Sequence, residues 1–177
     1  ICRSLDWEPD IFHSNDWHTA LIPFYLKQAQ LETNDFKNSR SVLTIHNAGY
    51  QGGAPGTFRH SLGIPLENFV LEMFEDHGHL NLLKGGINFA DQVNTVSPGY
   101  AEELRTPLGS HGLHETYLRK GKNFSGILNG CDYDEWNPET DPYLPANFSA
   151  KNLAGKKQCK QELQRLFGLP ESSSVPL

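Results

Sequence analysis

A short run of β-branched and aliphatic residues that ends abruptly at a polar pair is the pattern that most limits how this chain can fold. Residues 42–45 have the composition of a buried strand, and His46, Asn47 and a glycine-rich loop follow at once. In an open α/β sheet, ligands bind beyond the carboxyl ends of the strands. The pattern therefore predicts a strand that ends at a binding edge, although a histidine that only caps a strand end through a backbone hydrogen bond would fit the same residues.

The same pattern recurs along the chain, with helical segments between the apolar runs. The predicted strands cover residues 10–16, 42–45, 92–96 and 124–128, and they end at Asp16, at His46 with Asn47, at Ser97 and at Asn129. Alternation of strands and helices favours parallel strands joined by right-handed crossovers, that is, a doubly wound α/β sheet. Each polar residue alone could be a cap or a turn residue, but four at one edge favour a binding crevice.

Helix signals lie between these strands. A helix is expected to begin near Trp17 with Asp16 as its N-cap, and Pro23 fits it only near the first turn or at a kink. Further helices are expected over residues 80–91 and 113–120, and after Ser97, which is followed by a proline at the first helical position.

The segments between these helices are less regular in sequence. The stretch from Gly52 to about residue 65 is expected to be a long irregular loop of the kind that is functional or mobile. The spacing of residues 69–79 does not distinguish helix from strand.

Composition excludes several classes of protein. The 177 residues suit one domain, or one domain with a piece of another, and no apolar run approaches the ~20 residues of a membrane helix. With 21 acidic and 15 basic residues, the chain has no basic stripe for nucleic acid. Cys2, Cys131 and Cys159 are far apart and odd in number, which indicates reduced thiols in a cytosol-like compartment.

The character of the chain changes after Asn129. A polar, aromatic and proline-broken stretch over residues 131–147 is typical of a connection between two bodies. An amphipathic helix follows, with Cys159, Leu163, Leu166 and Phe167 on one face. We expect residues 1–130 to form one domain and residues 131–177 to form the connection and the first helix of a second domain, in a fragment of a longer protein.

The histidines and glycines do not match a metal site or a phosphate loop. The pairs His77 with His79 and His111 with His114 lack a third ligand at a recognised spacing. The glycine-rich loop after Asn47 matches neither a P-loop nor a dinucleotide fingerprint, and no nucleophile-elbow motif of a serine hydrolase occurs. We therefore expect no metal and no other cofactor.

The strand-end residues offer hydrogen-bonding groups and one carboxylate, but no arginine or lysine. A phosphorylated substrate needs a cationic clamp or a nest of backbone amides. This half of the crevice therefore suits an uncharged, polyhydroxylated group.

Four motifs together resemble one family. They are DIFHSNDWHTAL over residues 10–21, SVLTIHNAGYQG over 41–52, ADQVNTVSPGYAEEL over 90–104 and GILNGCDYDEWNPETD over 126–141. In this order the chain resembles glycogen synthases and starch synthases. The resemblance implies the second half of the N-terminal Rossmann-like domain of a GT-B glycosyltransferase, followed by the crossing to the C-terminal domain.

The resemblance also implies a function and roles for residues. Such enzymes transfer glucose from ADP-glucose or UDP-glucose to the non-reducing end of an α-1,4-glucan, with retention at the anomeric carbon. His46 would contact the transferred glucose near its 6-hydroxyl, and Asp16 would help to form the same pocket. The remaining substrate contacts implied are Asn129 at the hinge side of the cleft and Asn47, Tyr50 and Gln51 at its floor or acceptor channel.

Two alternatives to a synthase fragment stay open. A free-standing sugar- or glucan-binding module would use the same crevice without chemistry, and a flavodoxin-like nucleotide module would need a phosphate loop that the sequence lacks. The family's cationic phosphate clamp and essential glutamate lie outside the matched motifs, so the chain alone is expected to be inactive. If the strand order follows the family, the strand over residues 10–16 lies at an open edge, which favours self-association.

Overall fold

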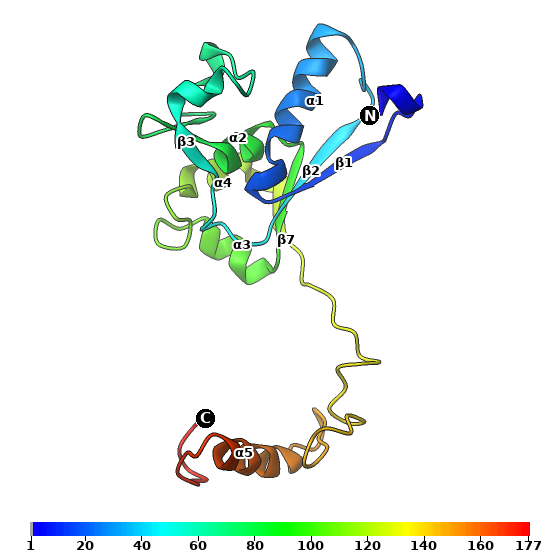
Figure 1. Cartoon of the computed structure of the whole chain (residues 1–177), viewed down its shortest axis with the longest axis vertical. Coiled ribbons are helices and arrows are strands. Elements are labelled where there is room, and N and C mark those ends of the chain that lie inside the picture. Colours follow the sequence, from blue (N-terminus) through cyan, green and yellow to red (C-terminus); the bar gives the residue numbers. More distant parts are fainter. Residues whose placement is uncertain (1) are drawn as a thin grey trace. The chain divides into compact units, whose positions relative to one another are not determined.

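The computed structural model describes residues 2–177, which form two compact units that divide between Asn129 and Gly130 (Figure 1). The first unit contains η1 (Arg3–Leu5), β1 (Ile11–Asn15), η2 (Trp17–Thr19), α1 (Leu21–Glu32), β2 (Arg40–Ile45), β3 (Gly53–Pro55), η3 (Gly56–Arg59), η4 (Leu66–Asn68), β4 (Glu75–Asp76), β5 (His79–Asn81), α2 (Leu82–Phe89), β6 (Gln92–Thr95), α3 (Pro98–Leu104), α4 (His114–Lys120), η5 (Gly121–Asn123) and β7 (Phe124–Gly126). The second unit contains α5 (Gly155–Leu166).

A four-stranded parallel sheet in the order β1-β2-β6-β7 forms the centre of the first unit. The predicted α/β architecture with parallel strands is therefore confirmed. The strands lie in sequence order, which is the arrangement within one half of a doubly wound sheet, since such a sheet reverses its order only at its midpoint. All four carboxyl ends consequently meet at one edge of the sheet.

Side chains of the sheet differ sharply between its two faces. In β2, Ser41, Leu43 and Ile45 are buried, whereas Val42 and Thr44 are half-buried. The buried face belongs to a core that also contains residues of α2, α3 and α4. Residues that share the opposite face, by their register with Val42 and Thr44, are mostly polar, namely His13, Asn15, Gln92 and Asn94.

The first long helix begins later than the sequence suggests. A 3-10 turn, η2, follows β1, and α1 starts only at Leu21. Pro23 is then the third residue of α1, where its missing amide costs no helical hydrogen bond. The conflict that the proline posed is therefore resolved by the later start of the helix.

The stretch after Gly52 is less irregular than expected, although residues 60–65 form neither helix nor strand. It contributes β3 to a small antiparallel sheet of order β3-β5-β4, which also accounts for the ambiguous residues before α2. Phe74 is fully buried beside this sheet and packs edge-on against Phe24 of α1. Strands of two or three residues are too short to give a period-2 signal, which is why the pattern missed them.

The glycine pair in α2 is explained by packing. A Cβ at Gly85 would lie 1.8 Å from the Phe74 ring, and one at Gly86 would lie 2.6 Å from the Cβ of Ala20. The predicted helix over residues 80–91 is present but shorter, because Asn81 ends β5 and caps α2 by accepting from the Lys84 amide.

Later elements follow the sequence more closely. Ser97 accepts from the Tyr100 amide and caps α3, with Pro98 at the first helical position, as predicted. The strand predicted over residues 124–128 ends at Gly126, so Asn129 lies three residues beyond it. A Cβ at Gly126 would lie 1.9 Å from the Ser97 carbonyl oxygen, so this close approach depends on glycine.

The second unit contains the helix that was predicted around Cys159. In α5, Leu163 and Leu166 remain 43% and 66% exposed, and Phe167, which follows the helix, is 73% exposed. Within residues 2–177, no helix is long and apolar enough to cross a membrane.

We predict that the first unit self-associates through β1, which is an edge strand of the described sheet. Ile11 is 53% exposed, and beside β1 a largely apolar pocket of about 460 Å³ is lined by Phe12, Tyr25, Phe36 and neighbouring residues. Light scattering of the chain should show concentration-dependent oligomers that Ile11→Lys weakens. Leu31→Lys, which adds the same charge at an exposed position of α1, should leave them unchanged; a monomer at high concentration would contradict the prediction.

Candidate functional site

The predicted site residues that follow β1 and β2 come together at the carboxyl edge of the sheet. β1 and β2 are adjacent and parallel, and Asp16 and His46 are the residues that directly follow them. His46 and Asn47 are exposed, and Asp16 is half-buried. The predicted edge of polar side chains is thus present at these two strands.

Asp16 connects the ends of the two strands and adopts a strained backbone. Its Oδ1 accepts from the His46 amide at 2.8 Å and from the Asn47 amide at 3.4 Å. Its φ of 52° and ψ of −174° lie close to a region that only glycine occupies freely, at a cost of about 1–3 kcal/mol. A conformation of this cost persists only where surrounding contacts determine it, and such residues concentrate at functional sites.

The prediction that Asp16 caps the next helix is wrong. No side-chain cap bond forms at η2 or at the start of α1. The Oδ1 atom of the carboxylate is instead engaged across the sheet edge by the two amides after β2.

The imidazole of His46 is held by Asn15, which the sequence pattern did not single out. Its Nε2 lies 3.0 Å from Oδ1 of Asn15, the last residue of β1. The ring is exposed, and its described contact is with an amide side chain. The alternative of a histidine that caps the strand end through the backbone therefore does not describe His46, whose backbone amide is held by Asp16 instead.

The loop after His46 is held by hydrogen bonds from its own side chains and by hydrogen bonds to two other segments. Asn47 Oδ1 accepts from the Gly49 amide at 2.9 Å, and the Tyr100 hydroxyl accepts from the Ala48 amide at 3.2 Å. Gln51 Nε2 donates to the carbonyl oxygens of Ala48 and His111 at 3.0 and 3.1 Å. Gln51 thereby ties the loop to the segment between α3 and α4.

A buried asparagine supports Gln51 from behind. Asn81 is 3% exposed, and its Nδ2 donates to Gln51 Oε1 at 2.6 Å and to Asp76 Oδ2 at 3.0 Å. Nearby, the Lys84 ammonium, also buried, donates to the Glu75 carbonyl oxygen at 2.7 Å. The small antiparallel sheet therefore fixes the loop. The sequence did not indicate this, because the contact between Asn81 and Gln51 joins residues thirty positions apart.

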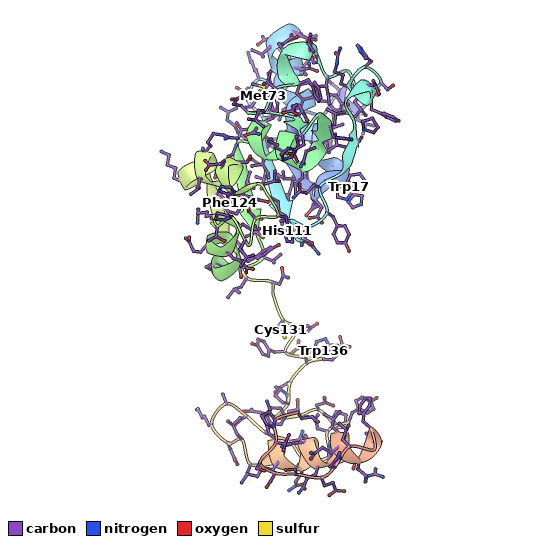
Figure 2. The ribbon with its side chains drawn as sticks, turned by 90° about the vertical axis from the view of Figure 1, so that its left-hand side faces the viewer. Trp17, Met73, His111, Phe124, Cys131 and Trp136 are labelled. Atoms are coloured by element: carbon purple, nitrogen blue, oxygen red, sulfur yellow. The ribbon has the colours of Figure 1, made fainter. Side chains whose placement is uncertain are left out.

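A pocket of about 310 Å³ opens beside this loop and is lined by Asp16, Trp17, His18, Asn47 and Tyr50. The Trp17 and His18 rings lie 4.1 Å apart between centroids, and Tyr50 is 67% exposed. Trp17, labelled in Figure 2, crosses so close to Gly52 that a Cβ there would lie 2.5 Å from the indole. The larger apolar pocket beside β1 has none of these polar groups, so the smaller one is the better candidate.

Asn129 is not joined to the other predicted residues. It is exposed beyond the end of β7, and β6 separates β7 from β2. Among residues 2–177, no hydrogen bond links it to Asp16, His46 or the loop after His46.

None of the residues that line the pocket is an arginine or a lysine. Within the part of the chain that the structure describes, no three histidine, cysteine or acidic side chains lie close enough together to hold a metal ion. The pocket therefore offers the groups that recognise hydroxyls, namely a carboxylate, an amide, an imidazole and aromatic faces.

We predict that Asp16→Ala exposes the amides of His46 and Asn47 to hydrogen exchange. Loss of the acceptor removes both charge-assisted bonds, each worth about 1.5–3 kcal/mol, so the two amides should exchange at least tenfold faster. Asp16→Asn retains an acceptor oxygen and should preserve most of the protection. Equal exchange rates in Asp16→Ala and the unchanged chain would show that the carboxylate does not hold the loop.

Comparisons with known proteins agree with the motifs. A family model described as the starch synthase catalytic domain matches residues 1–119. Glycogen synthase from Photobacterium profundum is 46% identical over 176 residues, covering 97% of this chain and 34% of that protein. Glycogen synthase 1 from Geobacter sulfurreducens is 45% identical, covering 99% of this chain and 35% of that protein.

A solved structure agrees as well. It is the catalytic domain of starch synthase IV from Arabidopsis thaliana bound to ADP and acarbose, with a TM-score of 0.69 and 38% identity, covering 99% of this chain and 36% of that chain. That neighbour is a GT-B glycosyltransferase catalytic domain, so the Rossmann-like fold expected from the resemblance is confirmed. The chain spans about a third of the length of these relatives. With a family model over most of its length and relatives at about 45% identity, this chain belongs to the starch synthase catalytic domain family.

Proposed function

We propose that this chain provides the sugar-facing wall of the active site of a retaining glucosyltransferase that extends α-1,4-glucan from a nucleotide-linked glucose. The observation that carries the proposal is the exposed His46 imidazole at the carboxyl edge of the sheet, held by the end of the neighbouring strand. Family membership supplies the reaction class. ADP-glucose is the proposed donor, with UDP-glucose as the alternative, because the similar starch synthase IV structure has ADP bound.

In this proposal, His46 acts by oriented hydrogen bonding. Transfer of glucose passes through an oxocarbenium-like transition state, and a preorganised contact favours the transition state because it costs no reorganisation during the reaction. His46 would bind near the 6-hydroxyl of the transferred glucose. Asp16 would hold His46 in this position by accepting a hydrogen bond from the His46 backbone amide. Asp16 would also form part of the same pocket.

The pocket beside the loop after His46, whose lining does not include His46 itself, suits the neutral sugars of donor or acceptor. Trp17 and Tyr50 offer aromatic faces, and Asp16 and Asn47 offer hydrogen-bond acceptors. Gln51, held between the Ala48 and His111 carbonyl oxygens, would shape the floor of the acceptor channel together with Asn47 and Tyr50. Asn129 would line the cleft at its hinge side.

The donor's phosphates need a partner that the pocket does not contain, because its lining residues include no cationic side chain. We therefore propose that a cationic clamp comes from another part of a complete synthase. Residues 1–130 would then be the second half of its N-terminal domain, and residues 131–177 would be the crossing and the first helix of its C-terminal domain. This chain alone would be inactive.

A non-catalytic module that binds sugar or glucan is the second candidate. The absence of a cationic side chain from the pocket lining favours it, since such a pocket could bind a neutral sugar without any chemistry. The two candidates differ in whether His46 contributes to turnover.

We predict that His46→Ala lowers turnover by about 10²- to 10³-fold in a complete synthase that carries this segment, because one preorganised contact to the transition state is lost. The exposed ring contributes little packing, so the temperature of unfolding should change little. Steady-state kinetics with ADP-glucose and a maltooligosaccharide would measure the first effect and calorimetry the second. A fully active variant would remove His46 from the mechanism and favour the binding module.

We further predict that residues 1–177 alone transfer no measurable glucose from ADP-glucose to a maltooligosaccharide. The matched control is a complete synthase assayed at the same molar concentration. A robust rate from the chain alone would contradict the proposal that the phosphate-binding groups lie elsewhere.

A further inference from the structure

We propose that Asn15 is the positioning residue for the His46 imidazole. Its side-chain oxygen accepts the Nε2–H of the ring and so leaves the Nδ1 lone pair as the ring atom that meets a sugar hydroxyl. The contact is 3.0 Å long and joins the last residue of β1 to the residue after β2. The inference rests on the proposed role of His46 in sugar binding and extends it to the tautomer of the ring.

Asn15 is itself held firmly. Its amide donates to the hydroxyl of Thr19 at 2.6 Å, and the same hydroxyl donates to the Asn15 carbonyl oxygen at 2.7 Å. Thr19 thereby closes the turn through η2 onto the end of β1. These bonds fix the backbone from which the Asn15 side chain extends toward the His46 ring.

The strained backbone of Asp16 makes the arrangement possible. In a regular strand, consecutive side chains point to opposite faces of the sheet, so Asn15 and Asp16 could not both reach the same residue. With a φ of 52° at Asp16, the Asp16 carboxylate accepts from the His46 amide while Asn15 contacts the His46 ring. The strain at Asp16 is therefore linked to holding His46 at two points.

The tautomer of the His46 ring determines which ring nitrogen can accept a hydrogen bond. A neutral imidazole carries one N–H and one lone pair, and a protonated ring carries two N–H groups. If Asn15 takes the Nε2–H, Nδ1 can accept from a hydroxyl only while the ring is neutral. Among the titratable groups of the neighbouring segments, Asp16 faces the His46 backbone amide, His18 lines the pocket, and His13 has its Nε2 2.7 Å from the Thr44 hydroxyl.

The ring itself can be observed by nitrogen NMR in this chain, with ¹⁵N-labelled histidine and with His46→Gln to assign the signals. In the unchanged chain, the neutral His46 ring should carry its proton on Nε2 alone. Asn15→Leu removes the acceptor, so the Nδ1–H tautomer should appear beside it. Asn94→Leu, on the same sheet face and in register with Thr44, is the matched control and should leave the ring unchanged.

Asn15→Asp keeps the shape and the acceptor but adds a negative charge. The ring should keep its Nε2–H, and its acid titration should move to higher pH, since an adjacent carboxylate favours the protonated ring. An Nδ1–H tautomer in the unchanged chain would overturn the proposal, because the Asn15 amide would then be the donor. Ring signals in Asn15→Leu identical to those of the control would overturn it as well.

Kinetics in a complete synthase separate this inference from the proposed function. The acid limb of the pH profile of kcat/KM should move to higher pH in Asn15→Asp and stay in place in Asn94→Leu. If the ring signals respond but the acid limb does not move, the role toward the sugar is overturned while the contact stands. If His46→Ala is inactive but the ring signals of Asn15→Leu match those of the control, the positioning role is overturned and the proposed function stands.

Discussion

The carboxylate of Asp16, shared by the His46 and Asn47 amides, is the contact on which the candidate site depends. It joins the ends of two adjacent parallel strands and fixes where the second strand turns into its loop. A glycine at that position would adopt the same backbone without strain but would supply no carboxylate. The chain therefore carries about 1–3 kcal/mol of local strain at the one position where a side-chain acceptor and a left-handed turn are both required.

A second layer of contacts makes the loop after His46 rigid. Gln51 bridges two backbone carbonyls, and the buried Asn81 holds Gln51 in turn. Because an unpaired buried amide costs about 1–3 kcal/mol, Asn81 and its partners exclude alternative positions of the loop more strongly than exposed contacts could. The small antiparallel sheet that positions Asn81 is therefore part of the machinery of the site, although none of its strands reaches the pocket lining.

The sequence could predict the parts of this structure that depend on local pattern. The apolar run of β2, the serine–proline start of α3 and the alternation of strands and helices are local, and each is present in the structure. What the pattern could not reveal depends on contacts between distant residues. Asp16 has the residue type and position of an N-cap, but its carboxylate is taken by amides thirty residues away. Asn15 lies inside the strand predicted over residues 10–16, and its link to His46 depends on the register of β1 with β2.

The distribution of charge along the sheet edge determines which kind of ligand the site suits. One carboxylate is present at the pocket, and it is directed at backbone amides, so much of its charge is satisfied before any ligand arrives. The other polar groups are the amide of Asn47, the imidazole of His18 and the hydroxyl of Tyr50, and together with the aromatic rings they can recognise hydroxyl groups. In the proposed function, a wall of this kind would bind the reacting sugar on the side away from the leaving group. Stabilising the negative charge that develops on a departing nucleotide then needs cationic groups on the opposite side, where they do not compete with the hydroxyl contacts.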